Sequence, residues 1–230
     1  MSQSATHRVL KRLGWSWRIP TKFQIHKYSH HNIARYLRYV NWVKTISPHR
    51  LHFMDESHIV PRELTKRKVL GLVNQRTYIK ESTLHQKSAS ITIVASLDEN
   101  EPVLFDYRIQ SNTQWNFVSF VWYCIKVGRF QEGDFLVVDN AAVHGGSESY
   151  PLLQLILDVA KLTLVFLPAY SPELNPCELV FNITKTHLRN NTSDQQLLLR
   201  LGHAISTVTY QKMLGFYQHC ILPKTVLVDY

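Results

Sequence analysis

The sequence predicts an α/β protein in which a mixed sheet is flanked by helices and preceded by a basic helical arm. Apolar, strand-like runs follow residue 50, and strands then alternate with helices toward the C-terminus. This order is typical of a sheet that carries helices on its faces. The charge pattern supplies the arm, because residues 1–50 contain ten Lys and Arg and no Asp or Glu, whereas residues 51–230 carry a net charge of −1.

Length and composition indicate one substantial core. The chain has 230 residues, of which 45% are hydrophobic, and this is enough for one good core with a small appendage. No apolar run approaches the ~20 residues that cross a membrane, and no signal-peptide pattern opens the chain. We therefore expect an intracellular protein, located in the nucleus of a eukaryote or in the cytoplasm, on the nucleoid, of a bacterium.

The cysteines argue against a scaffold of disulfides or a zinc site made of four cysteines. The chain has three of them, Cys124, Cys177 and Cys220, and they are widely spaced. Because a disulfide scaffold needs paired cysteines, a reducing compartment is the simpler interpretation.

The basic arm is predicted to hold two helices. The first covers residues 4–13 and ends at Gly14. The second is capped by Ser29 and runs to about Ile46, before Ser47 and Pro48 end it. The expected apolar faces consist of Thr6, Val9, Leu10 and Leu13 in the first helix and of Ile33, Leu37, Val40 and Val43 in the second.

A basic arm on a near-neutral body is the charge pattern of a nucleic-acid handle. Two alternatives are an organelle transit peptide and a solvated basic extension. The transit peptide is less consistent with Trp15, Trp17 and Trp42, which fall in helical or packed settings. We expect contacts with DNA or RNA, and the DNA-binding residues expected are Arg8, Lys11, Arg12, Arg18 and Lys22.

The body is predicted to begin with strands and to continue with alternating helices and strands. A turn at residues 98–102 separates the last two of the first four strands. The strands are expected at residues 51–55, 76–81, 90–97, 103–109, 135–139 and 162–167, and the helices at 112–126, 151–160, 175–190 and 193–219, the last broken near Gly202 or Gly215.

Three acidic residues stand where these elements begin or end. Asp55 and Asp139 each end an apolar strand-like run, and Glu178 opens a helix. Carboxylates at strand ends and on a neighbouring helix can converge on hard divalent cations such as Mg²⁺. A charge on a buried strand needs a partner or a metal, and two aspartates on adjacent strands repel each other unless a cation lies between them.

Each acid also has an ordinary structural explanation. Asp139 with Asn140 is compatible with a simple turn, and Asp55 with a polar strand end. Glu178 is the most ambiguous, because Asn175 is a good N-cap, Pro176 suits the first helical position and Glu178 falls at the third, as in a capping box.

Three sequence blocks carry a resemblance to a known family. They closely resemble the signature blocks of mariner-like DDE transposases and of the related bacterial insertion-sequence transposases. The similarity extends from about Ser2 to about Cys220, and the third block is the most specific. The blocks are FMDES at residues 53–57, VDNAAVH at 138–144 and LPAYSPELNPCE at 167–178.

The resemblance implies a ribonuclease-H-like fold with an Asp-Asp-Glu catalytic triad that holds two Mg²⁺ ions, for which Mn²⁺ can substitute. Asp55, Asp139 and Glu178 match the three acids, both as catalytic residues and as metal ligands. Asn140 and His144 match the motif residues beside the second acid and are expected to support it. Residues 170–172 are expected to shape the loop that delivers Glu178.

The chain departs from the family pattern in two places. Cys177 stands where a branched aliphatic residue is usual, and Phe181 where tryptophan is common, and neither alters the chemistry. The family usually carries two helix-turn-helix units, whereas residues 2–14 resemble only the last helix of the second. We therefore expect an N-terminally truncated protein with a remnant of the DNA-binding region plus linker at 1–47 and a ribonuclease-H-like catalytic domain at 48–230.

The leading functional hypothesis is a transposase catalytic domain that cleaves and joins double-stranded DNA, at transposon ends and at a target. A homodimer on paired ends is compatible with the resemblance. The second hypothesis is a catalytically inactive, transposase-derived DNA-binding protein.

A zinc hydrolase is a third hypothesis, because three histidines surround Asp55 in the sequence: His49, His52 and His58. However, odd offsets along a strand turn His52 and His58 away from the side of Asp55, and the chain has no His-Glu-x-x-His pattern. The same alternation places Glu56 outside the expected metal site.

Overall fold

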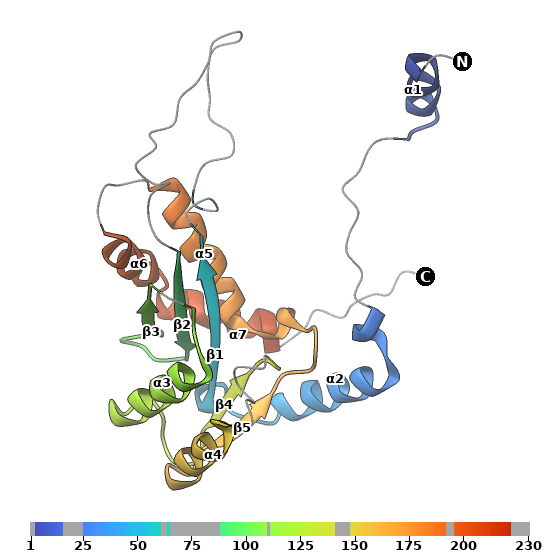
Figure 1. The fold of residues 1–230 in the computed structure, drawn as a ribbon. Coiled ribbons are helices and arrows are strands. Elements are labelled where there is room, and N and C mark those ends of the chain that lie inside the picture. The colour runs from blue at the N-terminus through green and yellow to red at the C-terminus, as the bar shows by residue number, and fades with distance from the viewer. Residues whose placement is uncertain are drawn as a thin grey trace.

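The computed structural model describes residues 3–15, 25–60, 64, 88–109, 111–140, 148–191 and 196–221. Within this part of the chain, one sheet has the strand order β3-β2-β1-β4-β5 (Figure 1). The predicted mixed sheet flanked by helices is confirmed. Its strands are β1 (Leu51–Ile59), β2 (Ala89–Ala95), β3 (Val103–Arg108), β4 (Phe135–Val138) and β5 (Thr163–Phe166).

Strand pairing places the two predicted aspartates side by side. β1 pairs antiparallel with β2 and parallel with β4, and β4 pairs parallel with β5. Met54 of β1 is level with Val138 of β4. Because parallel strands keep their register, Asp55 and Asp139 are the next residues along two adjacent strands.

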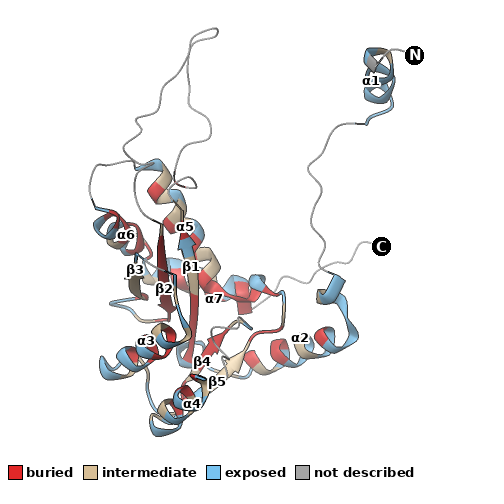
Figure 2. Ribbon diagram, in the orientation of Figure 1, coloured by how far each residue is buried: buried red, intermediate tan, exposed pale blue. Residues whose placement is uncertain are grey.

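The helices cover both faces of the sheet (Figure 1). Alternation along β1 sends Phe53 into the larger core, with α5 to α7, and Met54 into the smaller core, with α3 and α4. Figure 2 shows the buried residues gathered on the sheet and on the helix sides that face it. These helices are α3 (Gln114–Lys126), α4 (Tyr150–Val159), α5 (Pro176–Asn190), α6 (Leu197–Ser206) and α7 (Tyr210–Ile221), with the 3₁₀ turn η5 (Pro172–Leu174) before α5.

Two predicted boundaries in the body were wrong. β1 extends to Ile59 rather than ending at Asp55, because it continues to pair with β2 beyond the end of β4. The long helical stretch breaks at residues 207–209, whereas Gly202 and Gly215 lie inside α6 and α7. Three consecutive β-branched residues at the break disfavour a helix, and the N–H of Val208 donates to Ile205 O in a tighter turn. The predicted strand at 76–81 lies outside the described residues.

The arm contains α1 (Gln3–Arg12), η1 (Ile25–Tyr28) and α2 (His30–Val43), and η2 (Pro48–Arg50) leads into β1. The predicted cap of α2 is confirmed, because the Ser29 hydroxyl accepts a hydrogen bond from the N–H of Asn32.

The predicted apolar face of α2 was half wrong. Val40 and Val43 are buried as expected, but Ile33 and Leu37 are 41% and 56% exposed, and Asn32 is buried in their place. The buried stripe passes through the aromatic residues Tyr36 and Tyr39, which pack against the larger core. α2 therefore packs on the body through a face that includes one polar side chain.

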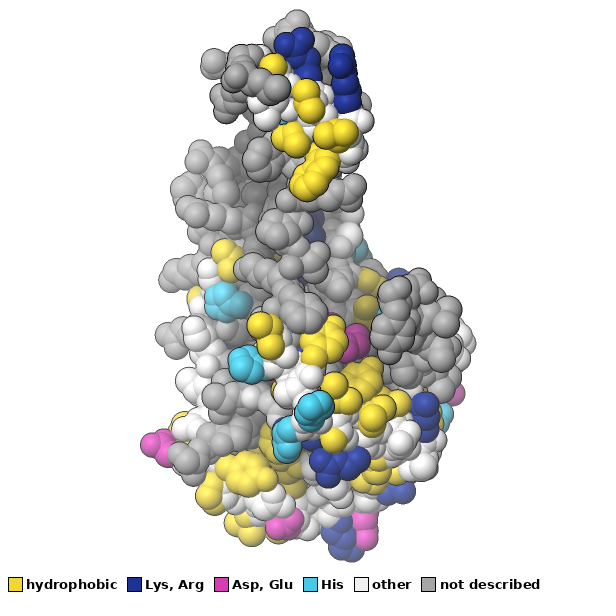
Figure 3. All heavy atoms as spheres, turned by 90° about the vertical axis from the view of Figure 1, so that its right-hand side faces the viewer, with side chains coloured by type: hydrophobic (Ala, Val, Ile, Leu, Met, Phe, Trp, Pro, Cys, Tyr) yellow, Lys and Arg dark blue, Asp and Glu magenta, His cyan; other side chains and the backbone are white. Residues whose placement is uncertain are grey.

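The stripe predicted for α1 lies at the surface. Val9, Leu10 and Leu13 are between 41% and 67% exposed. Figure 3 shows hydrophobic side chains of this helix beside its basic ones at the top of the view. The expected division of the chain at residue 47 stays a prediction.

No helix among the described residues is both long and apolar enough to cross a membrane. All three cysteines are buried free thiols, in agreement with the sequence-based expectation.

Candidate active site

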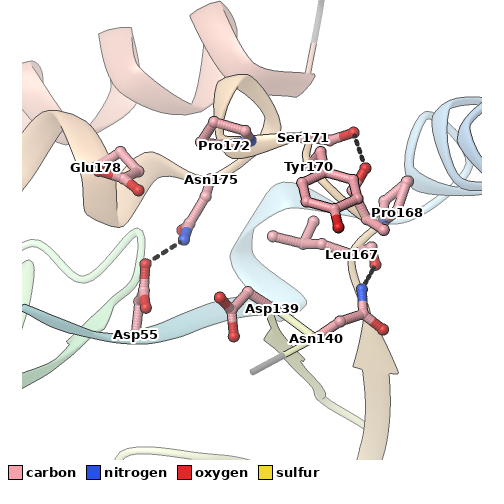
Figure 4. A pocket seen from close by; sticks show the side chains of 11 residues that line it. Asp55, Asp139, Asn140, Leu167, Pro168, Tyr170, Ser171, Pro172, Asn175 and Glu178 are labelled. Atoms are coloured by element: carbon pink, nitrogen blue, oxygen red, sulfur yellow. Dashed lines mark hydrogen bonds between the residues drawn. The ribbon is translucent and has the colours of Figure 1, made fainter. Parts of the chain in front are cut away.

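The first acid is held by two hydrogen bonds on a buried strand. Asp55 is 8% exposed. Its Oδ1 accepts from the backbone N–H of Glu56 at 2.7 Å, and its Oδ2 accepts from Nδ2 of Asn175 at 2.7 Å (Figure 4). The carboxylate is therefore fixed in orientation from the strand itself and from the loop opposite.

The second acid follows β4 directly. Asp139 is half-buried, and its neighbour Asn140 joins the end of β4 to the chain after β5. Nδ2 of Asn140 donates to the carbonyl of Leu167, and its Oδ1 accepts from Nη2 of Arg35 at 3.4 Å. Asn140 therefore fixes the chain beside Asp139, and its supporting role stays a prediction.

The third acid stands in the first turn of α5. Asn175 caps this helix, because its Oδ1 accepts from the N–H of Cys177 at 3.1 Å, as predicted. In a capping box, Glu178 would accept the backbone N–H of Asn175, but that N–H donates to the carbonyl of Pro172 at 3.0 Å. The cap therefore does not account for Glu178, whose side chain lines the pocket with the other two acids.

One cavity of about 380 Å³ brings the three acids together. Figure 4 shows Asp55 rising from within β1 and Asp139 from just beyond β4, with Glu178 on the helix and the chain before it forming the opposite wall. Its lining consists of Asp55, Asp139, Asn140, Leu167, Pro168, Ala169, Tyr170, Ser171, Pro172, Asn175 and Glu178.

The electrostatics of this cavity favour a cation. Burial, together with the nearby charges of Asp139 and Glu178, raises the pKa of Asp55 to about 7, against the lowering effect of the hydrogen bond from the Glu56 N–H. Carboxylates that repel one another and accept few hydrogen bonds are stabilised by a divalent cation with a preference for oxygen ligands. The donor set of this pocket fits Mg²⁺ or Mn²⁺.

The described residues contain no group of three Asp, Glu, His or Cys side chains already close enough together to hold a metal ion. The acids line the pocket without forming a finished cluster, and the Asn175 amide occupies one oxygen of Asp55.

The other predicted site residues lie in different places. Glu56 does not line the cavity. Arg8, Lys11 and Arg12 are exposed on α1. The predicted residues His144, Arg18 and Lys22 lie outside the described part of the chain.

The three histidines near Asp55 in sequence have separate partners. His49 bonds to the carbonyl of Leu97, His52 to Ser96 and Asp134, and His58 to Ser90. They do not line the pocket, and the zinc hypothesis gains no support from their positions.

Sequence reasoning missed two asparagines. Asn175 was predicted as a cap, and its contact with Asp55, 120 residues away in sequence, was not. Asn32 lies 5% exposed against the pocket loop. Its signal was present in the helical spacing of Asn32, Tyr36, Tyr39 and Val43, which places a polar residue on a buried stripe.

The family model described as "DDE superfamily endonuclease" matches residues 50–199 of this chain. The chain belongs to this family. All three acids of the pocket lie inside the matched region, whereas α1 and α2 precede it.

Solved structures with a similar fold include those of Mos1 transposase. The paired-end complex with the left transposon end is 14% identical with a TM-score of 0.68, and the match covers 96% of this chain and 68% of that one. The paired-end complex with Mg is also 14% identical with a TM-score of 0.63, covering 95% and 68%. The isolated catalytic domain is 12% identical with a TM-score of 0.62, covering 89% and 93%. No curated protein sequence gives a significant match.

This likeness confirms the ribonuclease-H-like fold expected for a DDE-family protein, with the sheet and its flanking helices in the arrangement of a transposase catalytic domain.

Proposed function

We propose that this DDE-family protein is a transposase catalytic domain that cleaves phosphodiester bonds of transposon DNA and transfers the cut strands. One observation carries the proposal: Asp55 and Asp139 stand level on adjacent parallel strands and share a pocket with Glu178. This is an acidic site open to a ligand, in a family of endonucleases.

We propose that Asp55, Asp139 and Glu178 hold two divalent cations, Mg²⁺ in the natural protein and Mn²⁺ as a substitute. Bound there, such ions supply an activated water or DNA 3′-hydroxyl and stabilisation of the leaving oxygen. The raised pKa of buried Asp55, beside two further acids, supports a site built for positive charge.

The protein's own part in this chemistry is to orient the acidic side chains. Asn175 and the Glu56 N–H fix the carboxylate of Asp55, and Asn140 ties the end of β4 to the chain after β5. The attacking groups are water and a DNA hydroxyl, so the proposed reaction needs no nucleophilic side chain and no covalent link between protein and DNA.

We propose double-stranded DNA as the partner, with the transposon ends and the target bound in turn. The basic arm supports this, through Arg8, Lys11 and Arg12 on α1 and through the predicted contacts Arg18 and Lys22. The similar Mos1 structure is a paired-end complex, and a homodimer that holds two DNA ends is our proposal for the active assembly.

The test is Asp139→Asn, measured against Glu56→Gln. Both variants neutralise one acid, but only Asp139 lines the pocket. We expect Asp139→Asn to abolish Mn²⁺ binding in calorimetry and to reduce nicking of DNA by on the order of 10³-fold or more, since it removes a ligand of the reacting centre. Glu56→Gln should have the milder effect on both.

The alternative is a DNA-binding protein that has lost catalysis. It predicts equal, weak Mn²⁺ binding by the parent and Asp139→Asn, no nicking by either, and DNA binding by both. The proposed function is wrong if folded Asp139→Asn cuts DNA as fast as the parent.

A further inference from the structure

The arm is joined to the wall of the active-site pocket at a buried point. Nδ2 of Asn32 donates to the carbonyl of Ala169 at 2.9 Å, and Oδ1 of Asn32 accepts from the N–H of Ala169 at 3.0 Å. The two residues are 137 positions apart. One side-chain amide therefore pairs with both backbone groups of one loop residue, as a neighbouring strand would.

Three further hydrogen bonds or ion pairs support the contact between the arm and the pocket. Nδ2 of Asn32 also donates to the carbonyl of Lys27 at 3.0 Å, which fastens η1 to α2. Nζ of Lys27 reaches Oε1 of Glu173 at 2.7 Å, on the far side of Ala169 along the loop. Nη2 of Arg35 contacts Oδ1 of Asn140 at 3.4 Å, beside the second acid.

The backbone of the loop at residues 167–174 has features that favour support from other parts of the protein. Tyr170, the residue after Ala169, has φ of +56°, in the left-handed region that costs a non-glycine residue roughly 1 kcal/mol or more. Pro168 and Pro172 on either side have no N–H to donate. The N–H of Ala169, between Pro168 and Tyr170, is therefore a backbone donor through which this turn of the loop is fixed from outside.

The loop leads directly to the catalytic acids. It runs through η5 to Asn175, which donates to Asp55 and caps the helix that carries Glu178. Figure 4 shows Pro168, Tyr170 and Pro172 on the wall that faces the two aspartates. A shift of the loop at Ala169 would be transmitted to this wall and to the start of α5.

We propose that Asn32 is a positioning residue, which fixes residues 167–174 so that Asn175 and Glu178 face Asp55 and Asp139. The inference rests on the proposed function for its catalytic consequence. It makes α2 a structural part of the active site, although the helix precedes the region that matches the family model.

The chemistry of asparagine explains why this residue suits the role. Aspartate at position 32 would keep an acceptor for the N–H of Ala169 but would lose the donor to the carbonyls of Ala169 and Lys27. An apolar residue would remove both hydrogen bonds, so that the N–H of Ala169 loses this acceptor and its carbonyl keeps only the Ser171 hydroxyl, at 3.2 Å, of these two donors. Asn32→Ala therefore removes both hydrogen bonds between residue 32 and Ala169, whereas Asn32→Asp removes only the one to the carbonyl.

The matched control is Leu37→Ala. Leu37 lies on the same helix, is 56% exposed, and does not line the pocket. All variants are made in the full chain, and their thermal unfolding is compared first.

The first measurement is amide hydrogen exchange of residues 167–178 in the metal-free protein. We expect exchange about 10-fold faster in Asn32→Ala, an intermediate change in Asn32→Asp and none in Leu37→Ala, because the lost hydrogen bonds protect this segment. Unchanged exchange in Asn32→Ala overturns the proposal. If that variant does not fold, the same comparison is decided with Asn32→Asp.

The second measurement distinguishes a role of Asn32 in positioning the acids from a role in the stability of the fold alone. We expect Asn32→Ala to weaken Mn²⁺ binding in calorimetry and to lower kcat for DNA nicking on the order of 10- to 100-fold, with little change in KM, since small misplacements of reacting groups have effects of this size. The proposal is overturned if Asn32→Ala has the same Mn²⁺ affinity and the same kcat as Leu37→Ala.

The proposed function and this inference can fail separately. A parent protein that never nicks DNA refutes the function, and the exchange and Mn²⁺ measurements then still decide whether Asn32 positions the acids. An active parent with an unaffected Asn32→Ala variant refutes the inference alone.

Discussion

At the scale of single residues, the buried carboxylate of Asp55 suits the proposed metal site but lowers the stability of the metal-free fold. Its carboxylate is buried beside Asp139 and Glu178, and its pKa is raised to about 7 in the absence of a cation. The hydrogen bonds from Asn175 and from the N–H of Glu56 offset part of the cost of the buried charge. A cation in the pocket would offset the remainder.

We predict that Asp55→Asn stabilises the metal-free protein at pH 8. A pKa raised from 3.8 to about 7 bounds the gain in the free energy of unfolding at about 4 kcal/mol, and we expect ~1–3 kcal/mol because the amide fits the two donors less well. Urea unfolding in EDTA measures the difference. Mn²⁺ should then stabilise the parent and leave the variant unchanged, and a variant that is less stable than the parent in EDTA would contradict this account.

At the scale of elements, a polar cluster fixes the end of the sheet opposite the three acids of the pocket. His52 of β1 bonds through Nε2 to Oδ2 of Asp134 at 2.9 Å and through Nδ1 to Oγ of Ser96 at 2.9 Å. Asp134 also accepts from the N–H of Gln131 at 2.7 Å. The cluster connects the start of β1 with the end of β2 and the start of β4, and so supports the register that aligns Asp55 with Asp139.

This cluster predicts a loss of stability in acid. Burial alone would raise the pKa of Asp134, but the hydrogen bonds from His52 and from the Gln131 N–H, with the charge of Arg50, hold it below its ordinary value. The folded state therefore binds fewer protons than the unfolded state. The contribution is complete above pH 3.8 and is lost as the pH falls through the lowered pKa.

We expect Asp134→Asn to lower the free energy of unfolding at pH 7 by ~1–3 kcal/mol, because it disrupts a buried, charge-assisted hydrogen bond. Its stability should depend less on pH below pH 4 than that of the parent. Urea titrations between pH 2.5 and pH 7 measure both effects. Glu132→Gln, at an exposed ion pair with Lys161, is the control and should change stability by less than about 0.5 kcal/mol. Parallel pH profiles for the parent and Asp134→Asn would refute the assignment.

The elements show what sequence patterns could and could not predict. The apolar runs before Asp55 and Asp139 predicted strands, and the cap at Asn175 predicted the start of α5. The contacts of Asn175 with Asp55 and of Asn32 with Ala169 join residues more than 100 positions apart. Nothing local distinguishes such an asparagine from a solvated one, because its partner is chosen by the tertiary packing.

At the scale of the whole molecule, charge and catalysis are separated along the chain. The three acids of the pocket lie in a body of net charge −1, whereas residues 1–50 carry +10. On α1, the exposed side chains of Val9, Leu10 and Leu13 accompany the basic ones. The arm therefore concentrates the positive charge that the acidic pocket lacks, and its helix α2 contacts the wall of the pocket through Asn32.

We predict that the arm dominates the salt dependence of DNA binding. Replacing Arg8, Lys11 and Arg12 together with Gln should reduce the slope of log K against log salt by about 2–3, since each phosphate contact contributes about 0.9. Fluorescence anisotropy with duplex DNA between 50 and 300 mM KCl, roughly the range over which such contacts weaken, measures the slope. The control replaces three basic side chains of the body with Gln, and the slope of log K against log salt should then be nearly unchanged. These side chains are Arg108, Lys126 and Lys161. Mn²⁺ binding at the pocket should be the same in all three proteins, because none of these side chains lines it. Equal slopes for the arm variant and the body variant would show that DNA is held elsewhere than on the arm.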